Sequence, residues 1–210
     1  IMTSLQHKVD FVLTFAVENA NPNGDPLNGN RPRTTAEGLG EMSDVAEKRK
    51  IRNRLQDAGE PIFVQSTDRT DDGEKSLSDR WKAFTKTLSK EDQKDREALS
   101  CRACEQWIVR SFGQVFAFKG KEKEGDASVS IPVRGPFTIQ SAFSLEPIAI
   151  DDVQITKSVN GETTDTNKKS SDTMGMKHRV SGRAVYVTRG SISPQLAEKT
   201  GFTEEDAEKI

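Results

Sequence analysis

Hydrophobic and polar residues alternate near the start of the chain in a pattern that predicts a β-strand. Residues 9–17 read VDFVLTFAV, and Phe11, Leu13 and Phe15 fall on one side of the alternation. The following residues 19–26 are rich in Asn, Gly and Pro, which favour turns. We therefore expect a central strand that leads into a polar loop ending at about Glu41.

An apolar stripe at helical spacing predicts a helix over residues 44–58. The stripe recurs at i, i+4 and i+7 and consists of Ile51, Leu55 and Ala58. Asp44 is suited to cap this helix, with Glu47 three positions later as in a capping box. Gly59 is typical of a helix end.

The rest of the pattern mixes helices with strands. Further helical segments are predicted at residues 91–112, 194–199 and from 203–206. Strands are predicted at residues 60–64, 115–118, 129–133, 137–143, 153–159 and 180–187. The polar residues 65–78, 119–128 and 160–173 are expected to form mobile or projecting loops.

The composition indicates that any site for nucleic acid must be local. Of 210 residues, 33% are apolar and 30% charged, a lean apolar content that favours polar arms outside a core. Lys and Arg total 31 against 33 Asp and Glu, so the net charge of -2 gives no overall attraction for phosphate. Two cysteines, no signal-peptide pattern and no long apolar run favour a reducing cytoplasm as the location.

The predicted helix from Asp44 carries the densest positive charge. Its cations are Lys48, Arg49, Lys50, Arg52 and Arg54. At about 100° per residue, Lys48, Arg49 and Arg52 share one arc of the helix. Lys50 and Arg54 lie on the other side of the apolar stripe. Such mutually repelling charges favour contact with phosphates, and a solvated basic face explains the same cluster equally well.

A turn between two predicted strands is a second candidate for binding a polynucleotide. It consists of Arg134, Gly135 and Pro136. Glycine permits close backbone approach and proline makes the turn rigid, so the Arg side chain is presented as a bidentate donor to a phosphate or base edge. An ordinary turn with a surface Arg is the alternative.

The loop that follows the first strand is a third candidate. Asn21 and Asn23 offer amide groups that suit the lining of a polynucleotide groove, and Arg31 and Arg33 flank Pro32 further along the loop. The alternative is a turn sequence that stabilises itself through Asx hydrogen bonds.

Residues 173–179 read TMGMKHR and end the polar loop predicted at residues 160–173. Met174 and Met176 suit a tip that inserts between bases, while Lys177 and His178 hold phosphates. A strand entry with methionines in the core is the alternative. His178 has no evident catalytic partner in the sequence.

The sequence shows no recognisable catalytic or metal-binding pattern. Cys101 and Cys104 lie within a predicted helix and lack the further ligands of a zinc site, so we expect buried free thiols. Nucleotide-binding, serine-hydrolase and zinc-protease motifs are absent from the sequence. We therefore predict no catalytic residue, no metal and no cofactor.

Short segments spread over nearly the whole chain form an ordered set. They are VDFVL at 9–13, NPNGDP at 21–26, DV at 44–45, KRKIRN at 48–53, SFG at 111–113, VRGP at 133–136, TMGMKH at 173–178, GSISP at 190–194 and LAEKTGF at 196–202. Together they resemble the type I-C CRISPR Cascade backbone subunit of the crRNA-binding RAMP superfamily. Type I-B subunits share the NPNGDP loop, whereas TMGMKH favours type I-C. VSGR at 180–183 departs from the family's Pro-Tyr-Gly type sequence, and family members continue further, so we expect the chain to be C-terminally incomplete.

The resemblance implies an α+β fold with an RRM-like (ferredoxin-like) palm, an inserted finger region and a projecting β-hairpin thumb. It divides the chain into palm at residues 1–59, 129–152 and 180–210, fingers at 60–128 and thumb at 153–179. The implied RNA contacts are Lys48, Arg49, Lys50, Arg52, Arg54, Arg134, Asn21, Asn23, Arg31 and Arg33. The implied thumb residues are Met174, Met176, Lys177 and His178.

The implied function is non-catalytic binding of the guide RNA (crRNA). Copies of the subunit self-associate into a helical backbone along the RNA, each thumb kinks the RNA, and the exposed bases pair with single-stranded target DNA. The other partners are further Cascade subunits, and no membrane is involved.

Two other classes of function stay open. Type III backbone subunits have a similar architecture and cleave RNA with a loop Asp, for which Asp25 and Asp172 are the candidates here. The second alternative is a basic-helix interaction module unrelated to CRISPR, which predicts no assembly that depends on RNA length.

Overall fold

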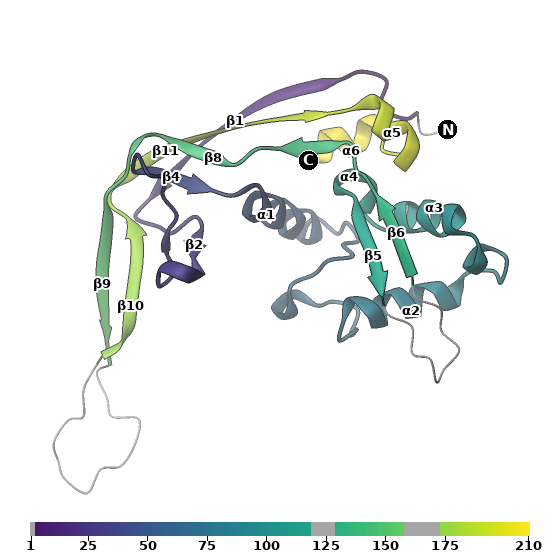
Figure 1. The fold of residues 1–210 in the computed structure, drawn as a ribbon, viewed down its shortest axis with the longest axis horizontal. Coiled ribbons are helices and arrows are strands. Elements are labelled where there is room, and N and C mark those ends of the chain that lie inside the picture. The colour runs from purple at the N-terminus through teal and green to yellow at the C-terminus, as the bar shows by residue number, and fades with distance from the viewer. Residues whose placement is uncertain (1–2, 119–128, 158–172) are drawn as a thin grey trace, which may run out of the picture. The chain divides into compact units, whose positions relative to one another are not determined.

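The computed structural model describes residues 3–118, 129–157 and 173–210 (Figure 1). The strands are β1 (Val9–Glu18), β2 (Gly24–Asp25), β3 (Arg31–Pro32), β4 (Leu39–Met42), β5 (Gln114–Phe118), β6 (Val129–Val133), β7 (Phe137–Ile139), β8 (Ala142–Pro147), β9 (Ile150–Thr156), β10 (Thr173–Val180) and β11 (Arg183–Ile192). The helices are α1 (Asp44–Asp57), α2 (Leu77–Thr87), α3 (Arg96–Gln106), α4 (Val109–Phe112), α5 (Pro194–Thr200) and α6 (Glu204–Lys209), with 3-10 turns η1 (Pro26–Asn28), η2 (Thr67–Arg69) and η3 (Asp92–Lys94). Helices combined with antiparallel sheets confirm the α+β class. Of the loops predicted at 119–128 and 160–173, all but Thr173 lie outside the described residues.

The chain forms two compact units, each with its own hydrophobic core. Unit 1 contains residues 1–11, 47–139 and 190–210, and unit 2 contains residues 12–46 and 140–189. The division cuts β1 after Phe11 and β11 after Arg189, so each of these strands contributes to both units. The palm, finger and thumb boundaries stay a prediction.

The largest sheet has the strand order β1-β11-β8-β4, and β7 pairs with the end of β11. Tyr186 of β11 lies opposite Ser144 of β8, and Phe143 of β8 lies opposite Glu41 of β4. The strand predicted at residues 9–17 is confirmed as β1, which stands at one end of this order among the described residues, and its central position in the sheet stays a prediction. Apolar alternation reports only that one face is buried, which is true of an edge strand as well as a central one.

An aromatic cluster forms the main core of unit 1. Trp81 and Phe84 of α2 pack with Phe63, Trp107 and Phe116, with ring centroids 4.3 Å apart for Trp81 and Phe116 and 4.7 Å apart for Phe63 and Trp107. All five side chains are buried. Burying one such side chain stabilises a fold by about 1.5–3 kcal/mol, so this cluster holds the helices and the β5–β6 ribbon together.

The helix predicted at residues 91–112 is broken into η3, α3 and α4. Trp107 follows α3 with an extended backbone (φ -130°, ψ 162°), and the N–H of Ile108 donates to the carbonyl oxygen of Pro61 at 3.0 Å. The break lets Trp107 enter the aromatic cluster, so tertiary packing overrides the local helical pattern. Helix α2 was not predicted, because its few apolar residues are separated by polar and charged ones.

The two thiols of α3 differ in their surroundings. Cys104 is buried as predicted, and burial raises the pKa of its thiol to about 11. Cys101 is exposed, so the prediction that both thiols are buried is wrong for Cys101. The residues lie at i and i+3 of one helix, and only the inner face of α3 contacts the core.

Helices α5 and α6 complete unit 1 and confirm two predictions from the sequence. Thr203 and Asp206 form a reciprocal capping box at the start of α6. Arg110 donates from Nε and Nη2 to the two carboxylate oxygens of Asp206 at 2.8 and 2.7 Å. Burial raises the pKa of Asp206, but the hydrogen bonds from Arg110 and Thr203 outweigh burial and hold this pKa below its usual range.

The helix predicted at residues 44–58 is confirmed as α1, with two corrections. Its cap is Ser43, whose hydroxyl accepts a hydrogen bond from the N–H of Ala46 at 3.3 Å, and not Asp44. Leu55 of the predicted stripe is buried, whereas Ala58 lies past the helix end and is exposed.

Three strand predictions also need correction. Residues 60–64 form an irregular segment whose apolar side chains, Ile62 and Phe63, are buried in two different clusters of unit 1. Residues 137–143 belong to two strands, β7 and β8. The strand predicted at 180–187 is β11, which begins at Arg183, while Val180 ends β10.

Unit 2 has a smaller core around Tyr186. This ring is fully buried and stacks on Phe15 at 5.5 Å, with Val17, Met42 and Ala142 around it. Strands β9 and β10 pair as an antiparallel ribbon in which His178 lies opposite Asp152 (Figure 1). In the described part of the chain, no helix combines the length and the apolar character needed to cross a membrane.

Candidate nucleic-acid interface

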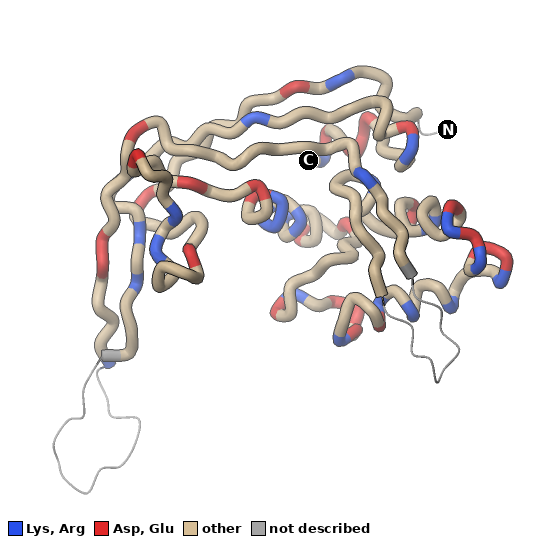
Figure 2. Tube along the Cα trace, in the orientation of Figure 1, with Lys and Arg blue, Asp and Glu red and all other residues tan. Residues whose placement is uncertain are grey.

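The five predicted cations of α1 belong to unit 1 and follow one another along the helix (Figure 2). Lys50 and Arg54 are exposed, whereas Lys48, Arg49 and Arg52 are half-buried. The half-buried group is the same three residues that helical geometry places on one arc. One side of α1 therefore combines positive charge with partial burial.

Arg52 is the most constrained of these cations. Its guanidinium carbon lies 4.5 Å from the centroid of the Phe112 ring, within the range of a cation–π contact. Burial, with a smaller contribution from the cation of Arg49, lowers the pKa of Arg52 to about 10. Burial also lowers the pKa of Arg49, whose Nη1 lies 3.4 Å from Oδ1 of Asn53. Both groups stay charged at neutral pH, and an anion bound beside them would offset the loss of hydration and the like-charge repulsion.

The turn with Arg134 is built against the chain that carries Phe112. A Cβ at Gly113 would lie 2.6 Å from the backbone nitrogen of Gly135, and a Cβ at Gly135 would lie 2.5 Å from the carbonyl carbon of Phe112. The two glycines thus allow backbones to meet where any side chain would collide. Arg134 is exposed, and within residues 3–118, 129–157 and 173–210 it has no ion-pair partner. The structure therefore brings the Arg134 turn next to the Arg52–Phe112 pair.

Hydrogen bonds to neighbouring segments hold the loop at residues 21–26. Nδ2 of Asn21 donates to the carbonyl oxygen of Asn30 at 2.8 Å. Oδ1 of Asn23 accepts from the N–H and the hydroxyl of Ser43, both at 3.0 Å. The N–H of Leu27 donates to Oδ1 of Asp25 at 3.1 Å, which is a local Asx bond of the kind that the alternative reading expects. A role of Asn21 and Asn23 in RNA binding stays a prediction.

Arg31 and Arg33 lie in unit 2, and each faces a carboxylate. Arg31 forms an ion pair with Asp152, whose Oδ1 lies 2.6 Å from Nδ1 of His178. The hydrogen bond to His178 and the charge of Arg31 lower the pKa of Asp152. Nη2 of Arg33 lies 3.7 Å from Asp25. The sequence does not indicate a role for Asp152, because only the register of β9 against β10 places it beside His178.

The predicted thumb residues lie on β10. Met174 and Met176 are 70% and 52% exposed, so the alternative of core methionines is wrong. Lys177 is exposed and lies opposite Val153, while His178 is half-buried beside Asp152. Insertion of Met174 and Met176 between bases requires such exposure, and this role stays a prediction.

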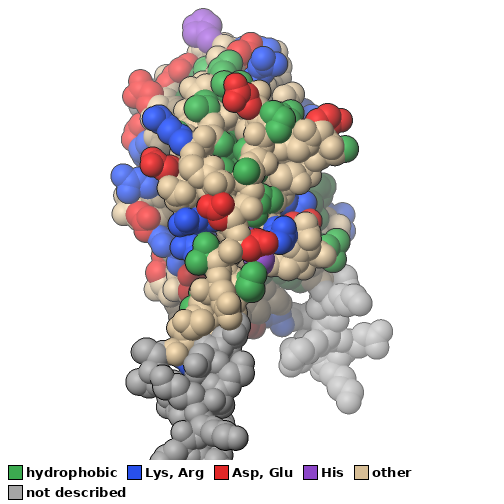
Figure 3. Space-filling model, turned by 90° about the vertical axis from the view of Figure 1, so that its left-hand side faces the viewer, with side chains coloured by type: hydrophobic (Ala, Val, Ile, Leu, Met, Phe, Trp, Pro, Cys, Tyr) green, Lys and Arg blue, Asp and Glu red, His purple; other side chains and the backbone are tan. Residues whose placement is uncertain are grey.

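Positive and negative side chains are mixed on the one face that Figure 3 presents. Figure 3 shows Lys and Arg side chains interleaved with Asp and Glu over the face that it presents. The cross-strand pair of Arg179 and Asp151, 3.5 Å apart, is one example from unit 2. Among the described residues, no three His, Cys, Asp or Glu side chains are arranged to hold a metal ion.

Comparisons with known proteins agree with one another. A family model described as "CRISPR-associated protein Cas7" matches residues 7–210. A Haloferax volcanii protein, also described as "CRISPR-associated protein Cas7", is 26% identical over 220 residues, which cover 100% of this chain and 63% of the relative. The chain thus spans about 63% of the length of this curated relative.

Two solved structures resemble the fold. A chain of a "CRISPR RNA-guided surveillance complex, pre-nicking" matches with a TM-score of 0.52 and 14% identity, over 97% of this chain and 69% of that chain. A chain of another "CRISPR RNA-guided surveillance complex" matches with a TM-score of 0.49 and 14% identity, over 97% of this chain and 56% of that chain. At this identity the first match indicates a shared fold only, and the second is too distant to support an argument.

Proposed function

The chain belongs to the Cas7 family of CRISPR-associated proteins, and on this premise we propose that it binds guide RNA without catalysis, as a backbone subunit of a type I-C interference complex. The observation that carries the proposal is the pair of half-buried guanidiniums on α1, with Arg52 held over Phe112 and the exposed Arg134 turn beside it. Charges placed in this way favour a chain of phosphates over water.

The proposed contact is with the RNA backbone and does not read its sequence. Lys48, Arg49 and Arg52 hold phosphates from one side of α1, and Arg134 anchors the strand nearby with its bidentate donor. The exposed cations Lys50 and Arg54 add to the positive electrostatic potential that attracts the RNA backbone. Base pairing then supplies sequence recognition, as in other guide-directed complexes.

Assembly completes the proposal. The sheet of β1, β11, β8 and β4 serves as an RRM-like palm, residues 60–128 as fingers, and the β9–β10 ribbon with Met174 and Met176 as the base of the thumb. Copies polymerise along the guide RNA, contact other Cascade subunits, and leave bases free to pair with single-stranded target DNA. The subunit cleaves neither nucleic acid.

The RNA site is tested with a triple variant, Lys48→Ala, Arg49→Ala and Arg52→Ala, measured by fluorescence anisotropy with labelled single-stranded RNA. Each lost phosphate contact should make the slope of log K against log[salt] about 0.7 shallower, so three lost contacts should change the slope by about 2. The matched control replaces three exposed lysines of unit 1, Lys86, Lys90 and Lys94, by Ala. An unchanged slope in a folded triple variant, or an equal change in the control, would sink the assignment.

Assembly and the absence of catalysis are tested separately. Light scattering with single-stranded RNA of increasing length should show a mass that rises in steps of one chain. A mass that stays at one chain on every RNA contradicts polymerisation. Incubation with complementary RNA and Mg²⁺ should leave the RNA intact, whereas cleavage abolished by Asp25→Asn would favour the type III-like endoribonuclease instead.

A further inference from the structure

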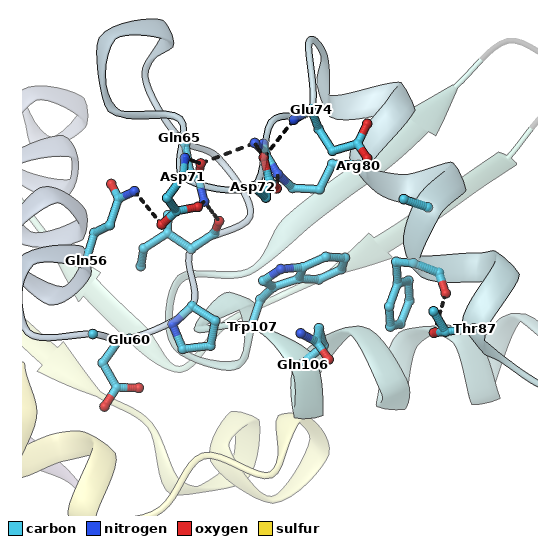
Figure 4. Close-up of a pocket in the computed structure, with 15 residues that line it drawn as sticks. Gln56, Glu60, Gln65, Asp71, Asp72, Glu74, Arg80, Thr87, Gln106 and Trp107 are labelled. Carbon is cyan, nitrogen blue, oxygen red and sulfur yellow. Dashed lines mark hydrogen bonds and ion pairs between the residues drawn. The ribbon is translucent and has the colours of Figure 1, made fainter.

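A cavity of about 500 Å³ lies entirely within unit 1, and none of the residues assigned to RNA lines it (Figure 4). We call it the Trp107 cavity. The end of α1, the loop at residues 65–74, helix α2 and Trp107 surround it. Its volume falls within the range of ligand pockets in proteins, roughly 300–1,000 Å³.

The loop over this cavity is fixed from the inside by Arg80. The side chain of Arg80 is buried and donates to the carbonyl oxygen of Phe63 at 2.7 Å, to Oε1 of Gln65 at 3.2 Å and to Oδ1 of Asp72 at 2.8 Å. The hydrogen bond to Asp72 raises the pKa of Arg80. These bonds tie Gln65 and Asp72 of the segment at residues 65–78 to α2, and the mobility of that segment stays a prediction.

Asp71 is the acidic group that this loop presents to the cavity. Its two carboxylate oxygens accept one amide hydrogen bond each, from Gln65 at 2.7 Å and from Gln56 at 3.0 Å (Figure 4). Both donors are neutral, and Asp71 has no ion-pair partner in the described part of the chain. Each carboxylate oxygen still has a free lone pair, so Asp71 is oriented and able to accept a charged donor.

Trp107 supplies a second group without a partner. Its side chain is 6% exposed, and its indole N–H has no hydrogen-bond acceptor among the residues that the structure describes. Figure 4 shows the nitrogen-bearing edge of the ring on the side facing Asp71 and Gln65. The indole nitrogen is not among the fully buried polar atoms, so solvent reaches it from the cavity. A ligand that brings an acceptor to this edge can therefore pair with the indole N–H in place of water.

The charges that line the cavity decide whether it attracts a cation or an anion. The cavity is lined by the carboxylates of Glu60, Asp71, Asp72 and Glu74 and by one cation, Arg80. Arg80 donates a hydrogen bond to Asp72, and Glu60 forms an ion pair with Lys209, whose Nζ lies 2.9 Å from Oε1 of Glu60. The remaining negative charge repels phosphates and attracts a cation.

We propose that the Trp107 cavity binds an arginine side chain of a partner protein. The guanidinium donates to the carboxylate of Asp71, and a backbone carbonyl of the same partner segment accepts from the indole N–H of Trp107. Arginine suits the site better than lysine because its planar donors match an oriented carboxylate with two oxygens. The site gives the protein a docking point for a basic protein segment that is separate from its proposed RNA contacts.

The test is an NMR titration, because the chain has only two tryptophans and therefore two indole N–H signals. Trp107→Phe, or Trp81→Phe if the first variant fails to fold, assigns them. The probe is the peptide acetyl-Gly-Arg-Gly-amide. The comparison peptide carries citrulline, which has nearly the shape of arginine without its charge.

The arginine peptide should shift the Trp107 signal in a saturable way, and the citrulline peptide should bind about tenfold more weakly or worse, since a hydrogen bond between charged groups is lost. Asp71→Asn should weaken arginine binding to a similar degree, whereas Glu91→Gln, which removes an exposed carboxylate elsewhere in unit 1, should not. Equal binding of both peptides, no shift with either (a cavity satisfied by water), or a shift with nucleosides in place of peptides would each overturn the proposal. None of these outcomes depends on the RNA-binding assay.

Discussion

Replacing Arg52 by Met should make the protein more stable and its RNA binding weaker. Burial and the neighbouring Arg49 lower the pKa of Arg52 from its ordinary value to about 10. One pKa unit corresponds to about 1.4 kcal/mol, so holding the charged form in the folded state costs about 3 kcal/mol. The contact with Phe112 returns about 0.5–2 kcal/mol. The net cost of the charge is therefore about 1–2 kcal/mol, and Met retains the packing without it.

The sign of this effect depends on pH in a defined way. Below pH 10, Arg52 is protonated in both the folded and the unfolded state, so the whole cost is present at neutral pH. Above pH 10 the folded state releases the proton before the unfolded state does, and the cost disappears as pH rises. The advantage of Arg52→Met over the wild type should thus be full at pH 7 and shrink above pH 10.

Urea unfolding at pH 7 measures the stability, and fluorescence anisotropy with single-stranded RNA measures the binding. For a chain of this size, 1 kcal/mol corresponds to a rise in Tm of about 2–4 °C. Arg54→Met removes an exposed cation from the same helix and should change stability by less than about 0.5 kcal/mol. The reasoning fails if Arg52→Met is less stable than the wild type, or if it binds RNA equally well at low salt.

Three further predictions concern other positions. Gly135→Ala places a Cβ 2.5 Å from a backbone carbon of α4, so we expect a loss of about 1–3 kcal/mol in urea unfolding, and a loss below 0.5 kcal/mol would contradict the packing. Asp206→Asn breaks the buried pair with Arg110 and should cost about 3–5 kcal/mol at pH 7. Because the folded-state pKa of Asp206 is lowered, the wild type should lose this stability as pH falls below about 4, and the variant should show a flatter acid limb. Asp152→Asn frees Arg31 and should steepen the salt slope of RNA binding by about 0.7, whereas an unchanged slope would place Arg31 outside the RNA site.

Part of the fold follows from local sequence. The alternation in β1, the helical stripe of α1 and the Thr203–Asp206 capping box each act within a few residues, and each is present in the structure. The basic cluster on α1 was predictable for the same reason, since helical periodicity alone puts Lys48, Arg49 and Arg52 on one arc. The family resemblance extended these local signals to the α+β class.

Other features depend on contacts between distant segments. The sequence did not predict the strand order β1-β11-β8-β4, because the period of a strand is the same at the edge of a sheet and in its centre. It predicted one long helix over residues 91–112, whereas the structure breaks this helix at Trp107. The break occurs because packing Trp107 against Phe63 and Phe84 stabilises the fold more than another helical turn would. It also gave no sign of Asp152, whose partners are chosen by strand register.

The same division applies to the candidate sites. The residue types alone determined that the chain has a cluster of cations and neither a catalytic motif nor a disulfide framework. Only the tertiary structure decided that Arg52 rests on Phe112, that Arg31 is paired, and that Asp71 and Trp107 face one cavity. Charge and periodicity are properties of neighbouring residues, whereas burial and partnership are set by which distant segments pack together.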